Sequence, residues 1–134
     1  MPDTAAGQRL AAALAIVKQR VPALHVTYTL AATPQGLPVS GIAQVQALKD
    51  AGVALDVLSL MTMDMGVPDV LSASMTAIAA GAGQLEGVYG LPQGAGMRRM
   101  GVIPMIGKDD QGAELDLVDA KTRTSLPRSL SSTR

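Results

Sequence analysis

Residues 53–63 constrain the fold more than any other stretch of the chain. The run reads VALDVLSLMTM and is apolar except at Asp56, Ser59 and Thr62. A strand with one solvent-exposed face carries a polar residue at every second position, whereas a strand buried on both faces is apolar almost throughout. The run therefore predicts a strand of a parallel sheet, with helices on one face and a core on the other.

The segments before this run alternate between helical and extended patterns. Residues 6–20 predict an amphipathic helix that Pro22 ends, and residues 24–30 alternate as a β-strand. The expected buried positions are Leu10, Ala13, Leu14 and Val17 in the helix, and Leu24, Val26, Tyr28 and Leu30 in the strand. A turn-rich segment, residues 31–41, leads to a second helix that Ser40 can cap and Gly52 ends.

The same alternation continues after the apolar run. A third helix is expected after Pro68, residues 100–107 predict a third short strand, and residues 113–123 predict a fourth helix. The third helix places Leu71, Met75, Ile78, Ala82 and Leu85 at spacings of three and four. This order predicts an α/β fold of about three parallel strands and four helices, joined by right-handed crossovers.

The length of the chain limits how much of such a fold it can form. The 134 residues suffice for one core but fall short of the ~250 residues of a closed (β/α)8 barrel. The chain is therefore expected to be one domain or a piece of one. We expect residues 1–122 to form it, and residues 123–134, rich in Ser, Thr and Arg, to be disordered.

Composition excludes several classes of function. The chain has 11 basic and 11 acidic residues, so no global field attracts nucleic acid or an anionic membrane, and no apolar stretch is long enough to predict a membrane span. It has no cysteine and a single histidine, His25, which argues against thiolate and histidine metal sites. No phosphate-binding loop or serine nucleophile motif is present. We expect no metal and no cofactor.

Asp64 is the one candidate acid that this pattern singles out. It follows the apolar run, and ligands of parallel α/β proteins bind at the carboxyl ends of the strands. Two interpretations stay open: Asp64 satisfies a loop or caps a helix, or it belongs to a site. His25 lies near the start of a strand, where a structural role is expected, and Lys108, Asp109 and Asp110 read as a solvated turn.

Three sequence blocks resemble bacterial chitinase-like proteins of glycoside hydrolase family 18. In that family a strand like S-[YF]-T-L-P leads through P-x-G-L to V-N-I-M-T-M-D-Y-G, and later to G-x-T-P-M-I-G-x-N-D. The matches are Tyr28-Thr29-Leu30, Pro34 with Gly36-Leu37, Met61-Thr62-Met63-Asp64 with Gly66, and Gly101 with Pro104-Met105-Ile106-Gly107. The blocks occur in the right order over roughly residues 10–120. The chain departs from the pattern at Ala31, Ser59, Met65 and Asp109, where the family has Pro, Asn, Tyr and Asn.

The resemblance implies a partial TIM (β/α)8 barrel that comprises the fifth, sixth and seventh strands. It implies that Met61, Met63 and Asp64 line a subsite for an N-acetylglucosamine ring, with Asp64 hydrogen-bonding the sugar in a catalytic site. Tyr28 and Met105 are assigned to substrate binding on the same basis. The implied partner is chitin or its N-acetylglucosamine oligosaccharides.

Family chemistry is hydrolysis with retention, assisted by the acetamido oxygen of the substrate. It requires a protonated glutamate at the end of a D-x-x-D-x-D-x-E strand, which this chain lacks. The two glutamates, Glu86 and Glu114, are expected in helices elsewhere. The resemblance thus implies a chitinase fragment that is inactive alone.

Two other functions stay open at this stage. The chain can be a non-catalytic carbohydrate-binding or scaffold module, or it can pair with another chain or self-associate, because three parallel strands leave two bare sheet edges. The resembled family is typically secreted, yet Met1 opens into Pro2-Asp3-Thr4 without a signal-peptide pattern. The compartment is therefore not predicted.

Overall fold

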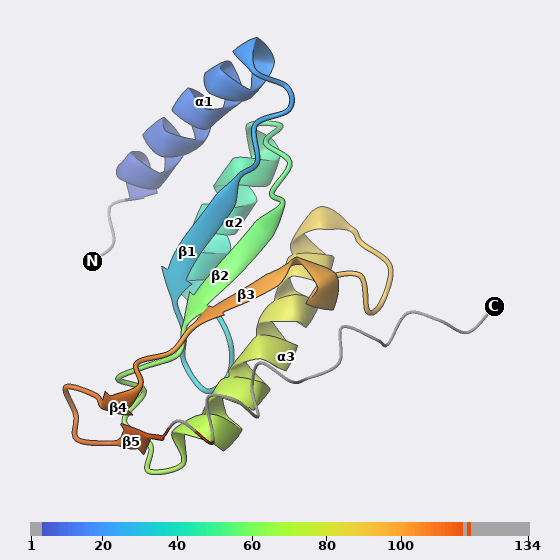
Figure 1. Cartoon of the computed structure of the whole chain (residues 1–134). Coiled ribbons are helices and arrows are strands. Elements are labelled where there is room, and N and C mark those ends of the chain that lie inside the picture. Colours follow the sequence, from blue (N-terminus) through green and yellow to red (C-terminus); the bar gives the residue numbers. More distant parts are fainter. Residues whose placement is uncertain (1–3, 117, 119–134) are drawn as a thin grey trace.

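The computed structural model describes residues 4–116 and 118, which form helices alternating with strands (Figure 1). The elements in chain order are α1 (Thr4–Arg20), β1 (Thr27–Ala31), α2 (Val39–Asp50), β2 (Val57–Met61), α3 (Val70–Tyr89), the 3₁₀ helix η1 (Met97–Arg99), β3 (Met100–Ile103), β4 (Gly107–Lys108) and β5 (Glu114–Leu115). The expected tail, residues 123–134, lies outside the described residues.

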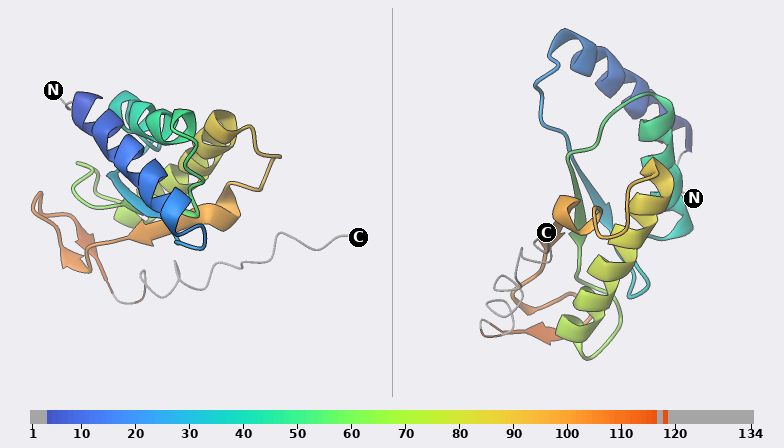
Figure 2. Two further views of the ribbon diagram at one scale, coloured as in Figure 1. Left: turned by 90° about the horizontal axis from the view of Figure 1, so that it is seen from above. Right: turned by 90° about the vertical axis from the view of Figure 1, so that its right-hand side faces the viewer.

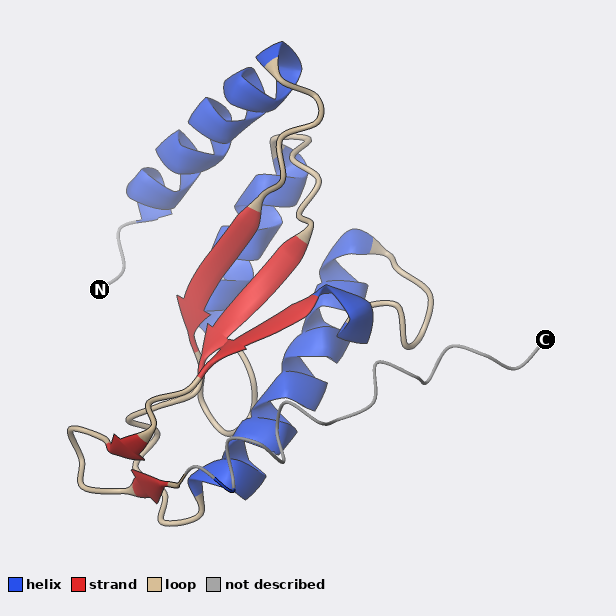
Figure 3. Ribbon diagram, viewed as in Figure 1, coloured by secondary structure: helices blue, strands red, loops and turns tan. Residues whose placement is uncertain are grey.

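Strands β1, β2 and β3 form one parallel sheet in that order, with β2 in the centre (Figure 3). Met61 lies in register with Ala31 on one side and with Ile103 on the other. The strands are joined by helices, as parallel neighbours require. The prediction of an α/β fold with about three parallel strands alternating with helices is confirmed.

The three helices all lie on one side of this sheet (Figure 2). Leu58 and Leu60 of β2 are fully buried there, where they pack with Val45 and Leu48 of α2. Gly81 permits the close approach of α3, because a Cβ at this position would lie 2.9 Å from Cδ1 of Leu60. The core therefore sits between the sheet and the helices.

The other face of the sheet has no covering layer among residues 4–116 and 118. Thr27, Thr29 and Ala31 of β1 point to this face and are exposed. Ile103 of β3 lies there too and keeps 41% of its surface accessible. Ser59 of β2 also points to this face but is buried, so the expected burial on both sides of the central strand holds at Ser59 although no described element covers its neighbours. We refer to this side of the sheet, opposite the helices, as the bare face.

The chain after β3 differs from the prediction. Residues 100–107 form two strands, not one, because β3 ends at Ile103 and β4 begins at Gly107, a glycine with φ of +92°. β5 (Glu114–Leu115) pairs with β4 where a helix over 113–123 was expected. Gly112, with φ of +83°, turns the chain back, and Leu115 is buried where β5 contacts α3. Tertiary pairing outweighs the helical pattern here. The rest of that predicted helix, apart from Asp116 and Val118, lies outside the described residues.

Two details of the helices also differ. In α1 the buried residue is Ala11, whereas Leu10 and Val17 of the expected stripe are 43% and 42% exposed. In α2 the N-cap residue is Pro38, with no side-chain cap, so Ser40 does not fill that role. No helix in the described part of the chain combines the length and apolar character needed to cross a membrane.

Candidate site at the carboxyl ends of the strands

The carboxyl ends of β1, β2 and β3 meet at one edge of the sheet, and Asp64 lies there. It follows β2 by three residues and is half-buried. Its φ of +52° makes it the one non-glycine residue with positive φ in the described chain. This left-handed conformation costs an aspartate of the order of 1 kcal/mol and persists only where the surroundings hold it.

Three hydrogen bonds from the turn after β4 hold Asp64 in place. Its N–H donates to Oδ2 of Asp109 at 3.0 Å. Its Oδ1 accepts from the N–H of Asp110 at 2.9 Å, and its carbonyl oxygen accepts from Nε2 of Gln111 at 2.8 Å. We call this set of bonds the Asp64 latch. The latch ties the loop after β2 to the hairpin formed by β4 and β5, which lies beyond the tips of the three parallel strands (Figure 1).

The latch leaves one carboxylate oxygen of Asp64 unused. Oδ1 is occupied, and Oδ2 accepts no hydrogen bond from any residue that the structure describes. A hollow of about 450 Å³ adjoins the latch, between residues 66–68 and residues 111–114. Asp64 itself does not line this hollow, but its free oxygen offers an acceptor at the carboxyl ends of the strands, which suits a hydroxyl or amide donor of a neutral ligand.

The sequence predicted both interpretations of Asp64, and the geometry contains elements of both. The carboxylate satisfies a loop N–H, as the structural interpretation holds, and it lies at the ligand-binding edge, as the site interpretation holds. A role in sugar binding stays a prediction.

The other candidate residues fall on different faces. Met61 lies on the bare face, in register with Ala31 and Ile103. Met63 and Met105 follow the ends of β2 and β3 and are half-buried, so they share the rim with Asp64. Tyr28 instead points to the helices, where its hydroxyl donates to Oε1 of Gln44 at 2.7 Å. Burial there raises the pKa of the Tyr28 hydroxyl. The structure therefore does not bring Tyr28 together with Met61.

The opposite rim of the sheet carries a different acid, Asp56. Its Oδ2 accepts from the N–H of Val26 at 2.7 Å and lies 3.8 Å from Nζ of Lys18. The bond from Val26 holds the pKa of this carboxyl below its usual value, with a smaller contribution from the charge of Lys18. Lys18 also donates to the carbonyl oxygens of Pro22 and Leu24. His25 is exposed beside this cluster. Oδ2 of Asp56 therefore stabilises the entry into β1, while its Oδ1 accepts no hydrogen bond from the residues that the structure describes.

The sequence did not identify Asp109 as part of the site. It reads as part of a solvated turn, yet its Oδ1 accepts from the N–H groups of Gln111 and Ala113, at 3.1 and 2.9 Å. An Asp followed three residues later by Gly is a turn signal, and it could have pointed to this residue. Its contact with Asp64, 45 residues away, could not be read from the pattern.

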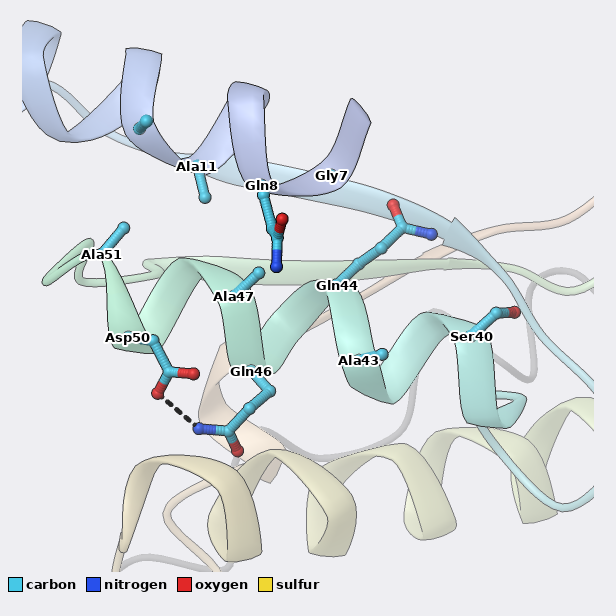
Figure 4. A pocket seen from close by; sticks show the side chains of 11 residues that line it. Gly7, Gln8, Ala11, Ser40, Ala43, Gln44, Gln46, Ala47, Asp50 and Ala51 are labelled. Atoms are coloured by element: carbon cyan, nitrogen blue, oxygen red, sulfur yellow. Dashed lines mark hydrogen bonds between the residues drawn. The ribbon is translucent and has the colours of Figure 1, made fainter. Parts of the chain in front are cut away.

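A second hollow lies away from the strand ends, between α1 and α2 (Figure 4). Its volume is about 390 Å³, and its walls are mainly small side chains and amides: Gly7, Gln8, Ala11, Ala12, Ala43, Gln44 and Ala47. Small residues on both helices leave this groove unfilled. Its one charged side chain, Asp50, is engaged by Nε2 of Gln46 at 2.7 Å. It brings no group suited to catalysis near Asp64.

The glutamates do not form an acid pair with Asp64 in the described chain. Oε1 of Glu86 accepts from the N–H of Gly96 at 2.8 Å at the end of α3. Glu114 lies on β5, not on a helix as expected, and lines the hollow near the latch. The described residues also contain no group of three or more His, Cys, Asp or Glu side chains able to hold a metal ion.

Solved structures similar to this chain include the catalytic domain of the hyperthermophilic chitinase from Pyrococcus furiosus. They also include catalytic-site mutants of active domain 2 of the chitinase from the same organism, one set of which is complexed with chito-oligosaccharides. Each aligns with a TM-score of 0.80 and 26% sequence identity, over 87% of this chain.

The fold is chitinase-like. The chain spans 39% of the length of these chitinase chains, so it matches part of a catalytic domain. These neighbours are archaeal, whereas the sequence blocks resemble bacterial proteins. No protein-family model and no curated protein sequence matches the chain.

Proposed function

We propose that this chain is the portion of a family 18 chitinase barrel that contains the fifth to seventh strands. In this proposal it forms one wall of the cleft that binds β-1,4-linked N-acetylglucosamine units. The observation that carries the proposal is the position of Asp64, whose free Oδ2 lies at the carboxyl ends of three strands of a chitinase-like sheet. Chito-oligosaccharides are bound by one of the structural neighbours, which supports the choice of ligand.

In this function Asp64 accepts a hydrogen bond from a hydroxyl or the acetamido N–H of the sugar. A charged acceptor makes a stronger hydrogen bond than a neutral one. Met63 and Met105 at the same rim, and Met61 on the adjoining bare face, supply apolar contacts for the faces of the sugar ring. Tyr28 is left out of this role, because its hydroxyl is engaged by Gln44 on the helix side.

The chain by itself is not expected to hydrolyse chitin. Retaining hydrolysis assisted by the acetamido group needs a carboxylic acid to protonate the leaving oxygen. Oε1 of Glu86 accepts a hydrogen bond from the N–H of Gly96, and Glu114 lies on the exposed side of β5. The proposed role of this chain is therefore to bind and orient the sugar, with the proton donor on the strand that precedes this portion of the barrel.

The test combines binding and turnover on the full 134-residue chain. Titration with tetra-N-acetylchitotetraose, followed by amide chemical shifts, is expected to move signals of residues 61–66 and 105–111. A fluorogenic chito-oligosaccharide is expected to remain uncleaved. The absence of any shift would overturn the binding role, and turnover that Glu114→Gln abolishes would overturn the claim of inactivity.

A second candidate function is a non-catalytic module that pairs with another chain through its sheet edges. The N–H of Ala32 donates to Met61, and the carbonyl oxygen of Val26 accepts from Val57, so these two residues face β2. The backbone groups of Thr27, Thr29 and Ala31 then point to the open edge of β1, because alternate residues face opposite neighbours. Such an edge invites pairing. Light scattering at micromolar concentration distinguishes the two functions, since a monomer that binds the sugar supports the first.

A further inference from the structure

Asp109 lies at the centre of the Asp64 latch, although the proposed sugar contact belongs to Asp64 alone. Its carboxylate accepts three backbone N–H groups. Oδ1 takes the N–H groups of Gln111 and Ala113 and shapes the hairpin turn. Oδ2 takes the N–H of Asp64 from the other loop. One side chain therefore joins the turn after β4 to the residue at the tip of β2.

The conformation of Asp64 gives this bond its importance. A left-handed backbone at a non-glycine residue is strained and needs bonds from its surroundings to persist. With φ of +52°, the Asp64 N–H meets Oδ2 of Asp109 while Oδ1 of Asp64 meets the N–H of Asp110. The backbone bond and the side-chain bond together fix the direction of the carboxylate, which leaves Oδ2 of Asp64 as the unused acceptor.

We propose that Asp109 is a positioning residue for the sugar site, which acts through the N–H of Asp64 to hold its free carboxylate oxygen at the rim. This inference rests on the proposed function, because in that function Asp64 accepts a hydrogen bond from the sugar. Asp109 itself touches no sugar. Its contribution is to remove the alternative conformations that Asp64 would otherwise sample, so that fewer of them must be frozen when the ligand binds.

The chemistry of the Asp109 side chain makes the inference testable by a single-atom change. A carboxylate can accept on both oxygens, whereas an asparagine has one accepting oxygen and one NH₂ donor. In Asp109→Asn, an NH₂ group replaces one carboxylate oxygen. This donor must then face another donor, either the N–H of Asp64 or the N–H groups of Gln111 and Ala113. The variant therefore breaks one half of the latch without changing the size of the side chain. The resembled family carries Asn at this position, so the proposed dependence on a second accepting oxygen is specific to the latch of this chain.

Asp56→Asn is the matched control. It makes the same change in a carboxylate that also accepts a backbone N–H, at the opposite rim of the sheet. Asp56 lies outside the proposed site. Asp56→Asn therefore reproduces the loss of stability that comes from replacing a hydrogen-bonded carboxylate, and it leaves Asp64 undisturbed. Gln111→Ala is the milder companion variant, because Gln111 is exposed and donates only one of the latch bonds from its side chain.

The experiment measures the affinity for tetra-N-acetylchitotetraose at a temperature where all variants are folded, together with the amide signal and hydrogen exchange of residue 64. Asp109→Asn is expected to weaken binding roughly tenfold and to move and deprotect the residue 64 amide, as loss of one charged hydrogen bond implies. Gln111→Ala is expected to act in the same direction by roughly threefold, and Asp56→Asn to change neither readout.

The outcomes separate the inference from the function on which it rests. If the wild-type chain binds the sugar and Asp109→Asn behaves like Asp56→Asn in both readouts, the positioning role is wrong and the proposed function stands. If Asp109→Asn does not fold, an unaltered affinity and an unaltered residue 64 amide in Gln111→Ala overturn the inference. If the wild-type chain binds no sugar, both proposals fall.

Discussion

The two rims of β2 each carry an aspartate, and the two residues are used in different ways. Asp56, before the strand, accepts a backbone N–H from Val26 and lies beside Lys18. Asp64, after the strand, is held by three bonds in a strained backbone and keeps one oxygen free. Each carboxylate keeps one oxygen without a hydrogen bond in the described chain, so the two residues differ in the left-handed backbone of Asp64 and in its place at the carboxyl ends of the strands. The difference lies in the surroundings, not in the residue type.

The largest expected effect comes from removing the core that supports both rims. Leu60→Ala should lower the free energy of unfolding by about 3 kcal/mol, because Leu60 is fully buried between β2 and α3. Urea unfolding followed by circular dichroism measures it. Ile103→Ala on the bare face is the control, with an expected loss below about 1 kcal/mol. Equal losses would mean that the bare face is as well packed as the helix side.

The next effect separates the two rims by binding. Asp64→Ala should weaken the affinity for tetra-N-acetylchitotetraose about tenfold or more, because the charged acceptor is lost. Asp56→Ala should leave the affinity of the folded chain unchanged. Amide-shift titration measures both dissociation constants. Equal dissociation constants for the wild type and Asp64→Ala would remove the functional half of the comparison.

The contribution of Asp56, at the opposite rim of the sheet, to the free energy of unfolding should depend on pH. The pKa of Asp56 is lowered in the folded chain, so its ionised form stabilises folding at pH values above the unfolded pKa of about 4. That stabilisation is lost as the pH falls through the folded pKa. Asp56→Ala should cost about 1–2 kcal/mol near pH 7, since the N–H of Val26 and the charge of Lys18 lose their partner.

The measurement is the difference in free energy of unfolding between the wild type and Asp56→Ala across pH 7 to 3. The difference should shrink as the acid limit is approached. A difference that grows at low pH would show that the sign assigned to Asp56 is wrong.

The smallest expected effect sharpens the boundary of the site. Tyr28→Phe removes the hydroxyl that donates to Gln44 and should lower stability by about 1 kcal/mol. It should not alter sugar affinity, because Tyr28 lies on the helix side of the sheet. A change in the dissociation constant with unchanged stability would return Tyr28 to the site, as the sequence resemblance implies.

The elements themselves were largely predictable from local pattern. The helix that Pro22 ends, the strand containing Tyr28 and the helix ending at Gly52 all appear where periodicity and turn residues place them. The choice of buried face was less predictable. In α1 the small residue Ala11 is buried and Leu10 is exposed, because close packing against α2 favours a small side chain over a larger one.

The candidate site was predictable in part. Asp64 could be found because a lone acid after an apolar strand marks the carboxyl edge of a parallel sheet. Its latch could not, because the partners come from a hairpin that sequence analysis read as the end of a strand and the start of a helix. Glu114 was misplaced for the same reason.

The amino-acid sequence alone was enough to predict a parallel α/β sheet and an acid after its central strand. Periodicity and turn chemistry are local properties, so they can be read along the chain. The folded chain was needed to find that Asp64 adopts a left-handed backbone, that Asp109 bonds its N–H, and that Asp56 bonds the N–H of Val26. Those outcomes depend on hydrogen bonds between residues at least 30 positions apart, and no local pattern specifies them.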